Sequence, residues 1–166
     1  KDFCINGLIG PDREPHPHLY EIKKGYQSIR SKAIDLNKGI IQITNGYTFQ
    51  SLAKFYLKWQ IHADSTLLKE NTIEMPALIP KQSHEFKLGY DWAELEKSAS
   101  TLAGSEVFLT LHFMLREDQA WAPKDHELGF DQYKLNIKTP SAAVVSIPSD
   151  AKLVGTIEND HLIVKN

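Results

Sequence analysis

The sequence contains little of what marks a disulfide-bonded, metal-binding or membrane protein. Its single cysteine, Cys4, excludes an intrachain disulfide framework and a cysteine-based zinc motif, and it leaves the compartment, cytoplasm or periplasm, open. No apolar run approaches the ~20 residues of a membrane-spanning helix, and the first residues do not resemble a signal peptide. Neither sign of charge dominates, because 19 basic and 21 acidic residues are scattered along the chain. We therefore expect no nucleic-acid partner and no membrane partner.

What the sequence does contain is the patterning of β-strands. In residues 54–62 every second side chain is apolar, which is the period of a strand with one buried face. The predicted buried face consists of Phe55, Leu57, Trp59 and Ile61. Residues 106–115 repeat the pattern, and Phe108 and Met114 on the opposite parity indicate that the second face of this strand is also partly covered. These two segments are the strongest predicted strands.

Weaker strand patterns accompany these two. Residues 26–36 predict an edge-type or bulged strand, because their apolar side chains fall on both parities. Asn37–Gly39 predict a hairpin turn, after which Tyr47 and Phe49 keep the parity of the returning strand and are expected to fold over the core. The remaining predicted strands lie around Ile41 and Ile43 and at 66–74, 85–88 and 126–137.

Helical patterning is nearly absent. The one predicted helix is short and lies at Asp91–Lys97, with Asp91 as its N-cap and Glu94 in the capping-box position. About seven strands with turn signals at short intervals and almost no helix predict an all-β fold. We expect an antiparallel immunoglobulin/fibronectin-like β-sandwich that spans residues 26–137.

Both ends of the sequence differ from this sandwich. Residues 1–25 combine isolated apolar residues with Gly and Pro, which predicts a segment that crosses from one folded body to another. Residues 138–141 have the composition of a linker. Beyond them, Val144-Val145, 153–157 and 161–164 predict the opening strands of a second β-domain that these 166 residues do not complete.

No set of residues predicts catalysis by this chain alone. Catalysis by a pair of carboxylates needs two acidic side chains that face each other across the reacting bond. Glu94 and Glu96 would point to different faces of the short helix, so we interpret them as surface residues. His16 and His18 lack the further ligands of a metal site and are expected to cap backbone groups or to lie exposed.

Three aromatic residues allow a different function. Tyr90, Trp92 and Trp121 lie in or beside predicted loops, where an exposed ring can stack on the face of a sugar. A stand-alone carbohydrate-binding or adhesion module is therefore the alternative function. The competing structural interpretation is that Trp92 and Trp121 fold back over the ends of the sandwich, because isolated aromatic residues at the surface need no functional explanation.

Phe3–Leu8 and Asp12–Pro17 closely resemble the Phe-Cys-x-Asn-Gly-Leu and Asp-Arg-x-Pro-His-Pro motifs of large bacterial β-galactosidases, glycoside hydrolase family two. In that family these motifs lie where the chain leaves the catalytic barrel. Later parts of the sequence resemble the family in the same order, at Ile41-x-Ile43, Tyr47-x-Phe49, Trp59, Ala120-Trp121 and Gln132-Tyr133. A sister enzyme, such as a β-glucuronidase or a β-mannosidase, shares the sandwich but fits Phe3–Leu8 less well.

The resemblance implies a domain organisation. Residues 1–25 would be the exit segment of a catalytic barrel, 26–137 the fourth domain of the enzyme, and 138–166 a linker with the truncated first strands of a C-terminal supersandwich. The chain would then be a non-catalytic spacer in a retaining β-galactosidase that hydrolyses terminal β-D-galactosides. Its partners would be the barrel and the supersandwich of the same polypeptide, and the β-galactoside would be the substrate of the parent enzyme.

The resemblance also implies site residues. The backbone carbonyl of Phe3 and the side-chain oxygen of Asn6 match positions that bind an alkali cation beside the galactosyl pocket, and the Phe3 ring matches one that moves as substrate goes deeper. Oxygen donors of this kind suit a hard cation such as sodium. The parent enzyme would use magnesium and sodium or potassium. This fragment would hold no cofactor, and it would be inactive because both catalytic glutamates belong to the barrel.

Overall fold

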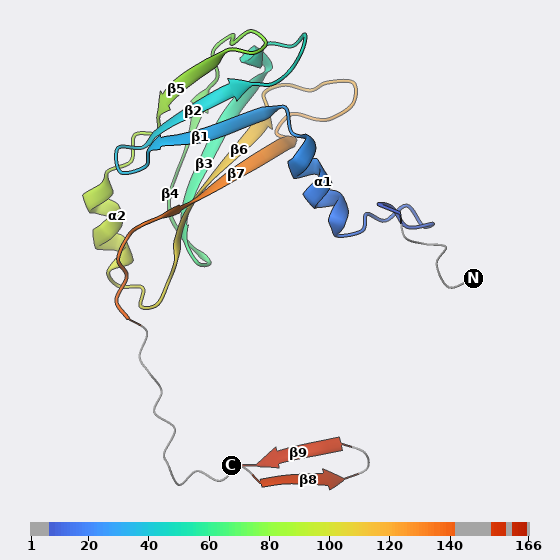
Figure 1. The fold of residues 1–166 in the computed structure, drawn as a ribbon, viewed down its shortest axis with the longest axis vertical. Coiled ribbons are helices and arrows are strands. Elements are labelled where there is room, and N and C mark those ends of the chain that lie inside the picture. Colours follow the sequence, from blue (N-terminus) through green and yellow to red (C-terminus); the bar gives the residue numbers. More distant parts are fainter. Residues whose placement is uncertain (1–6, 142–153, 159–160, 166) are drawn as a thin grey trace.

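The protein folds into two antiparallel sheets whose inner faces share one core (Figure 1). The structure is a computed structural model that describes residues 7–141, 154–158 and 161–165. One sheet has the order β1 (Ile29–Asp35), β2 (Ile40–Asn45), β5 (Ser83–Lys87). The other has the order β4 (Thr66–Glu74), β3 (Phe55–Ala63), β6 (Val107–Leu115), β7 (Glu127–Leu135). The predicted antiparallel β-sandwich is confirmed.

The core is centred on β3 and β6, the two strands with the clearest sequence alternation. β3 lies between β4 and β6, and each of its four predicted core side chains is at most 1% exposed. Phe108 and Met114 on the outer face of β6 are half-buried, as their apolar character indicated. Burying one large apolar side chain contributes about 1.5–3 kcal/mol, so these strands supply much of the stability of the sandwich.

The hairpin of β1 and β2 contains the predicted edge strand and the predicted turn. β1 is the outer strand of its sheet, and its register shifts between Ala33 and Asp35, which is the expected bulge. Gly39 closes the turn with a φ of +69°, a conformation that L side chains rarely adopt. A Cβ at Gly39 would also lie 3.3 Å from the Tyr90 ring, so glycine suits this position for two reasons.

The predicted short helix is present as α2 (Trp92–Ala99). The Asp91 carboxylate accepts a hydrogen bond from the Glu94 backbone N–H at 3.0 Å, which is the expected N-cap. The helix buries Leu95 and Ala99 against the sandwich. The Glu94 carboxylate accepts from the Lys69 ammonium at 2.9 Å, so α2 is tied to β4 as well.

Two predictions about local structure were wrong. The segment before β1 forms a second helix, α1 (His18–Tyr26), although only one helix was predicted. None of the α1 residues is fully buried, and its short apolar stripe of Leu19, Ile22 and Tyr26 at helical spacing was not recognised as a helix. Phe49 is 95% exposed and does not fold over the core, because β2 ends at Asn45 and the chain turns away there.

The turn after β2 is fixed by a buried amide. The fully buried side chain of Asn45 donates hydrogen bonds to the carbonyls of Gln50 and Leu78, at 2.8 and 2.9 Å, and accepts one from the Tyr47 N–H at 2.9 Å. η1 (Leu52–Lys54) then leads into β3. Tyr47 itself does contact the core as predicted, with its ring stacked on Phe55 at 5.8 Å.

The C-terminal strands predicted at 153–157 and 161–164 form an antiparallel hairpin, β8 (Val154–Glu158) and β9 (His161–Lys165). They pair with each other in a two-stranded sheet of their own. The predicted strand at Val144-Val145 lies outside the described residues. Neither helix of the described residues has the length and apolar character needed to span a bilayer.

Candidate functional site

The residues that the family resemblance assigned to a cation site, Phe3 and Asn6, lie outside the described residues, so these assignments stay predictions. The neighbouring histidines are described and cap one backbone carbonyl, one of the two outcomes expected for them. His16 Nδ1 lies 2.6 Å and His18 Nε2 3.1 Å from the Gly7 oxygen. Within residues 7–141, no group of three or more His, Cys, Asp or Glu side chains could hold a metal ion.

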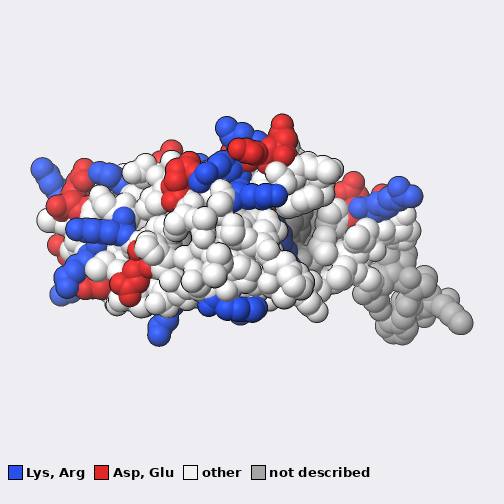
Figure 2. All heavy atoms as spheres, turned by 90° about the horizontal axis from the view of Figure 1, so that it is seen from above, with Lys and Arg blue, Asp and Glu red and all other residues white. Residues whose placement is uncertain are grey.

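The two glutamates of α2 are surface residues, as predicted. Glu94 Oε2 pairs with Lys69, and Glu96 Oε1 accepts a hydrogen bond from Trp92 Nε1 at 3.0 Å. Similar short pairs are spread over the surface, such as Lys38 with Asp35 at 3.1 Å. On the face shown in Figure 2, acidic and basic side chains are intermixed, in agreement with the scattered charges of the sequence.

The three aromatic residues of the alternative function do not form one platform. Tyr90 is only 6% exposed, contacts the Trp59 ring edge-on at 5.8 Å and donates a hydrogen bond to the Leu36 carbonyl. Burial, reinforced by the charge of Asp35, raises its pKa to about 12. Trp92 is partly buried against the core, as the structural interpretation expected. Trp121 is 63% exposed, so the prediction that it folds back over the sandwich was wrong.

A polar network joins α1 to the sandwich. The Asp131 carboxylate on β7 accepts hydrogen bonds from the Ser31 N–H at 2.7 Å, the Ser31 hydroxyl at 2.6 Å and the Gln27 amide at 2.9 Å. It also forms an ion pair with Lys24 of α1. We call Lys24, Gln27, Ser31 and Asp131 the α1 latch. Because it connects α1, β1 and β7, it fixes the direction in which the chain enters the sandwich.

Close backbone approach completes the α1 latch. Gln27 Oε1 accepts a hydrogen bond from the Phe130 N–H at 3.1 Å, and a Cβ at Gly129 would lie 2.5 Å from this oxygen. Sequence reasoning missed the latch, although Asp131 shares the inward parity of Gly129, Tyr133 and Leu135 on β7 and a carboxylate on that face was an available signal. Its partners lie at least 100 positions earlier in the chain, and no local pattern connects them.

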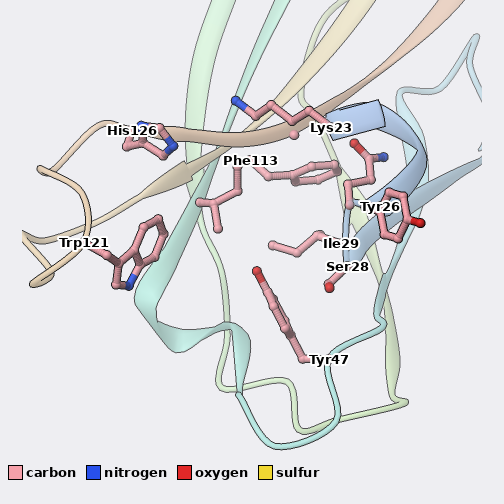
Figure 3. A pocket seen from close by; sticks show the side chains of 11 residues that line it. Lys23, Tyr26, Ser28, Ile29, Tyr47, Phe113, Trp121 and His126 are labelled. Atoms are coloured by element: carbon pink, nitrogen blue, oxygen red, sulfur yellow. The ribbon is translucent and has the colours of Figure 1, made fainter. Parts of the chain in front are cut away.

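A pocket of about 280 Å³ lies beside the α1 latch, between α1, the start of β1, β7 and the loop that carries Trp121 (Figure 3). Phe113 and Ile29, both buried, form its apolar floor. Figure 3 shows Tyr47 reaching into the pocket with its hydroxyl foremost, between Trp121 and Ser28. We call it the Trp121 pocket; its lining residues are Lys23, Tyr26, Gln27, Ser28, Ile29, Tyr47, Phe113, Trp121, His126, Leu128 and Gly129.

Some polar groups of the Trp121 pocket already have hydrogen-bond partners in the protein, and others do not. Lys23 Nζ donates to the Glu127 carbonyl at 2.6 Å, and both polar atoms of the Gln27 side chain belong to the contact with β7. The hydroxyls of Tyr47 and Ser28 have no hydrogen-bond partner among the described residues. Burial raises the pKa of Tyr47, which keeps its hydroxyl protonated and able to donate.

The two antiparallel sheets and their shared core define an all-β domain of the immunoglobulin/fibronectin type. Residues 41–136 match the family model described as β-galactosidase, domain 4. The match covers more than half of the chain and includes the whole of β3, β6 and β7. The chain belongs to this family, and the resemblance to bacterial β-galactosidases seen in the sequence is confirmed.

Curated relatives carry the same name. The chain is 29% identical over 143 residues to a β-galactosidase of Priestia megaterium, 27% over 135 residues to one of Yersinia enterocolitica and 28% over 137 residues to one of Pectobacterium atrosepticum. These alignments cover 81–86% of this chain. The chain spans only 12–13% of the length of these relatives, so similarity concerns one part of each of them.

Proposed function

We propose that this chain is a non-catalytic structural domain of a retaining β-galactosidase that hydrolyses terminal β-D-galactosides. The observation that carries the proposal is the match of residues 41–136 to domain 4 of β-galactosidase, together with the small share of the relatives that the chain spans. In this proposal the sandwich is a rigid spacer between a catalytic barrel and a C-terminal β-domain. The barrel supplies the two carboxylates that double displacement requires.

The N-terminal segment supports the part of the proposal that concerns the barrel. It places four large apolar side chains at the surface, with exposed fractions between 37% and 85%; these are Leu8, Ile9, Tyr20 and Tyr26. A segment that exposes so many apolar groups suits a chain that lies against another folded body. Residues 1–25 are therefore proposed as the exit segment of the barrel, and 138–166 as a linker with the first strands of the C-terminal domain.

The α1 latch supports the rigidity that a spacer needs. The Asp131 side chain is 13% exposed and its oxygens are shared among three hydrogen-bond donors and the Lys24 ammonium. Hydrogen bonds to a partly buried carboxylate are stronger than those between neutral groups, and their directions restrict the helix. A barrel joined to α1 would consequently have a defined orientation relative to the two sheets.

The proposed contribution to the parent's active site is small. The backbone carbonyl of Phe3 and the side-chain oxygen of Asn6 would be two ligands of a sodium or potassium ion, and the remaining ligands and the magnesium site would belong to the rest of the enzyme. Hard oxygen donors fit such a cation. Two ligands make an incomplete coordination shell, so the isolated chain should bind sodium only weakly.

The test is to assay the complete polypeptide that contains this sequence with an aryl β-D-galactoside. We expect saturable hydrolysis, and proton NMR should show that the first product keeps the β-configuration at its anomeric carbon. We also expect a barrel-length sequence ahead of Lys1 with two glutamates at catalytic positions. A polypeptide that lacks such a barrel, or that does not hydrolyse galactosides, would contradict the proposal.

A further inference from the structure

We propose that the Trp121 pocket is a binding site for a pyranose ring of a saccharide. This goes beyond the spacer role, because the site uses residues of this chain alone and no catalytic group. The inference depends on three features of the pocket: an exposed indole in an ordered loop, hydroxyl groups with unused hydrogen-bonding capacity, and a volume that suits one ring.

The indole of Trp121 is exposed but held in place. Its loop is closed by two backbone hydrogen bonds between Gln119 and Ala122, at 2.9 and 3.3 Å, and the Asp118 carboxylate accepts from the Lys124 N–H at 2.7 Å. The indole meets the ring of His126 edge-on at a centroid distance of 5.9 Å. A large ring that is 63% exposed and already ordered can stack on the C–H face of a pyranose without a further loss of loop freedom.

Opposite the indole, the pocket presents unused hydroxyl groups. The Tyr47 ring is stacked on Phe55, which fixes the direction of its hydroxyl toward the centre of the pocket (Figure 3). Ser28, the residue before β1, adds a second hydroxyl. Each hydroxyl can donate one hydrogen bond and accept others, which is also the capacity of every sugar hydroxyl. A stacking ring on one wall and hydroxyls on the other match the two kinds of surface of a pyranose.

Other classes of occupant fit the pocket less well. An anion would need free positive charge, but the Lys23 ammonium is bonded to the Glu127 carbonyl and lies 3.9 Å from its carboxylate. An apolar side chain of another polypeptide would bury the Tyr47 and Ser28 hydroxyls without partners, which is unfavourable. The volume of about 280 Å³ lies just below the usual range for ligand pockets, which favours a single ring over a larger ligand.

The test is an NMR titration of the ¹⁵N-labelled 166-residue chain with methyl β-D-galactopyranoside. The chain has three tryptophans, and each gives one indole N–H signal. We expect a saturable shift of the Trp121 signal with a midpoint in the millimolar range, whereas the signals of buried Trp59 and of Trp92, which donates to Glu96, stay in place. Sorbitol, an acyclic polyol without a flat ring face, should shift none of the three.

Three variants distinguish binding in the Trp121 pocket from a nonspecific effect of the sugar on the NMR signals. Trp121→Ala should weaken binding roughly tenfold, the size of loss seen when a stacking ring is removed, and because this variant lacks the Trp121 signal it is followed through the backbone amide signals of Ser28 and Gly129 in the pocket. Tyr47→Phe removes one hydroxyl and should weaken binding several-fold, followed through the Trp121 signal. Phe49→Ala is the matched control, because Phe49 is 95% exposed and does not line the pocket, and it should bind like the unaltered chain.

A Trp121 signal that does not move, or that moves linearly with sugar and equally with sorbitol, would overturn the proposal. So would equal affinity of the Tyr47→Phe variant and the unaltered chain, or shifts that depend on protein concentration without sugar, which would indicate that a second copy fills the pocket. The titration needs only the isolated chain. Its failure would therefore leave the proposed place of the chain in a β-galactosidase unaffected.

Discussion

Asp131 shows how far the arrangement of α1 depends on one carboxylate. Its oxygens accept from Ser31 and Gln27 and pair with Lys24, and these partners belong to β1, to the residue after α1 and to α1 itself. The Ser31 hydroxyl in turn meets the Tyr133 hydroxyl at 2.7 Å. Removing the carboxylate would leave several donors without an acceptor at a partly buried position, which is the costly way to break a polar network.

Asp131→Ala should lower the free energy of unfolding by about 3 kcal/mol, because the Lys24 charge and the donors of Ser31 and Gln27 lose their common partner. Urea denaturation followed by tryptophan fluorescence measures this loss. Glu70→Ala is the control, since Glu70 is an exposed carboxylate of β4 that pairs with Lys58 at 3.4 Å, and its stability should stay unchanged. Equal stability of the two variants would show that the α1 latch contributes nothing.

The raised pKa of Tyr90 predicts that the free energy of unfolding falls at alkaline pH. Burial is the main cause that raises its pKa from 10.0 to about 12, so the folded state holds the phenol proton more tightly than the unfolded state does. The stabilisation is complete below pH 10.0 and is lost as the pH rises toward about 12. Over that interval the loss should be roughly 3 kcal/mol, measured by urea denaturation at increasing pH.

Tyr90→Phe is the matching control for this pH dependence. The variant loses the hydrogen bond to the Leu36 carbonyl and should be somewhat less stable at neutral pH, but its stability should fall less steeply above pH 10.0. Part of the slope should remain, because burial and the hydrogen bond with Asp125 also raise the pKa of Tyr56 to about 12. An unchanged slope in the variant would contradict the assignment to Tyr90.

Among the elements, β3 and β6 could be predicted from sequence because a strand with one buried face leaves a period of two in the chain. Nine residues of each strand follow the pattern, and their inner side chains are almost completely buried. α1 was missed, because its apolar stripe consists only of Leu19, Ile22 and Tyr26, none of them is fully buried, and the helix is held by the polar α1 latch. Its stability depends on partners far along the sequence, and a local pattern carries no information about them.

Trp59→Ala should be among the most destabilising substitutions in the chain. Trp59 is 1% exposed at the centre of β3, and deleting its ring leaves a cavity that costs roughly 3–5 kcal/mol. Trp59→Phe should cost less, about 1–2 kcal/mol, because Trp59 Nε1 is buried without a hydrogen-bond partner among the described residues and its loss removes an unsatisfied donor. Equal losses in the two variants, measured by urea denaturation, would contradict this.

The cap of α2 is a smaller and local contribution. Asp91→Ala removes the hydrogen bond to the Glu94 N–H and should lower stability by about 1 kcal/mol. Asp91→Asn keeps a side-chain oxygen that can accept the same bond, so it should retain most of the stability. Thermal unfolding of both variants compares them directly, and an alanine variant as stable as the asparagine variant would show that the cap is not used.

For the whole molecule, sequence reasoning reached the sandwich and the family but not the sites at its surface. The family was recognisable because residues 3–8 and 12–17 carry specific motifs, and the core strands carry strong alternation. The Trp121 pocket was not predictable, because it forms only where α1, whose helical structure the pattern missed, lies beside β7 and the Trp121 loop. The roles of Phe3 and Asn6 stay predictions that depend on the resemblance.

At the scale of the whole molecule, the surface contacts agree with the proposed supporting role of the domain. The acidic side chains that sequence reasoning considered for catalysis bind surface partners, and the most connected carboxylate of the described residues, Asp131, holds a helix in place. The exposed apolar side chains of residues 8–26 suit contact with a larger body. The sandwich, by contrast, has a complete core of its own, so we expect the 166-residue chain to unfold cooperatively when isolated.

Hydrolysis of an aryl β-D-galactoside by the isolated, folded 166-residue chain tests the non-catalytic role most directly. Folding is verified on the same sample by a cooperative urea transition of its tryptophan fluorescence. We predict no saturable turnover at any substrate concentration, since the carboxylate pair required by a retaining mechanism is expected from the barrel. Saturable turnover that disappears together with the folded state in urea would contradict this role.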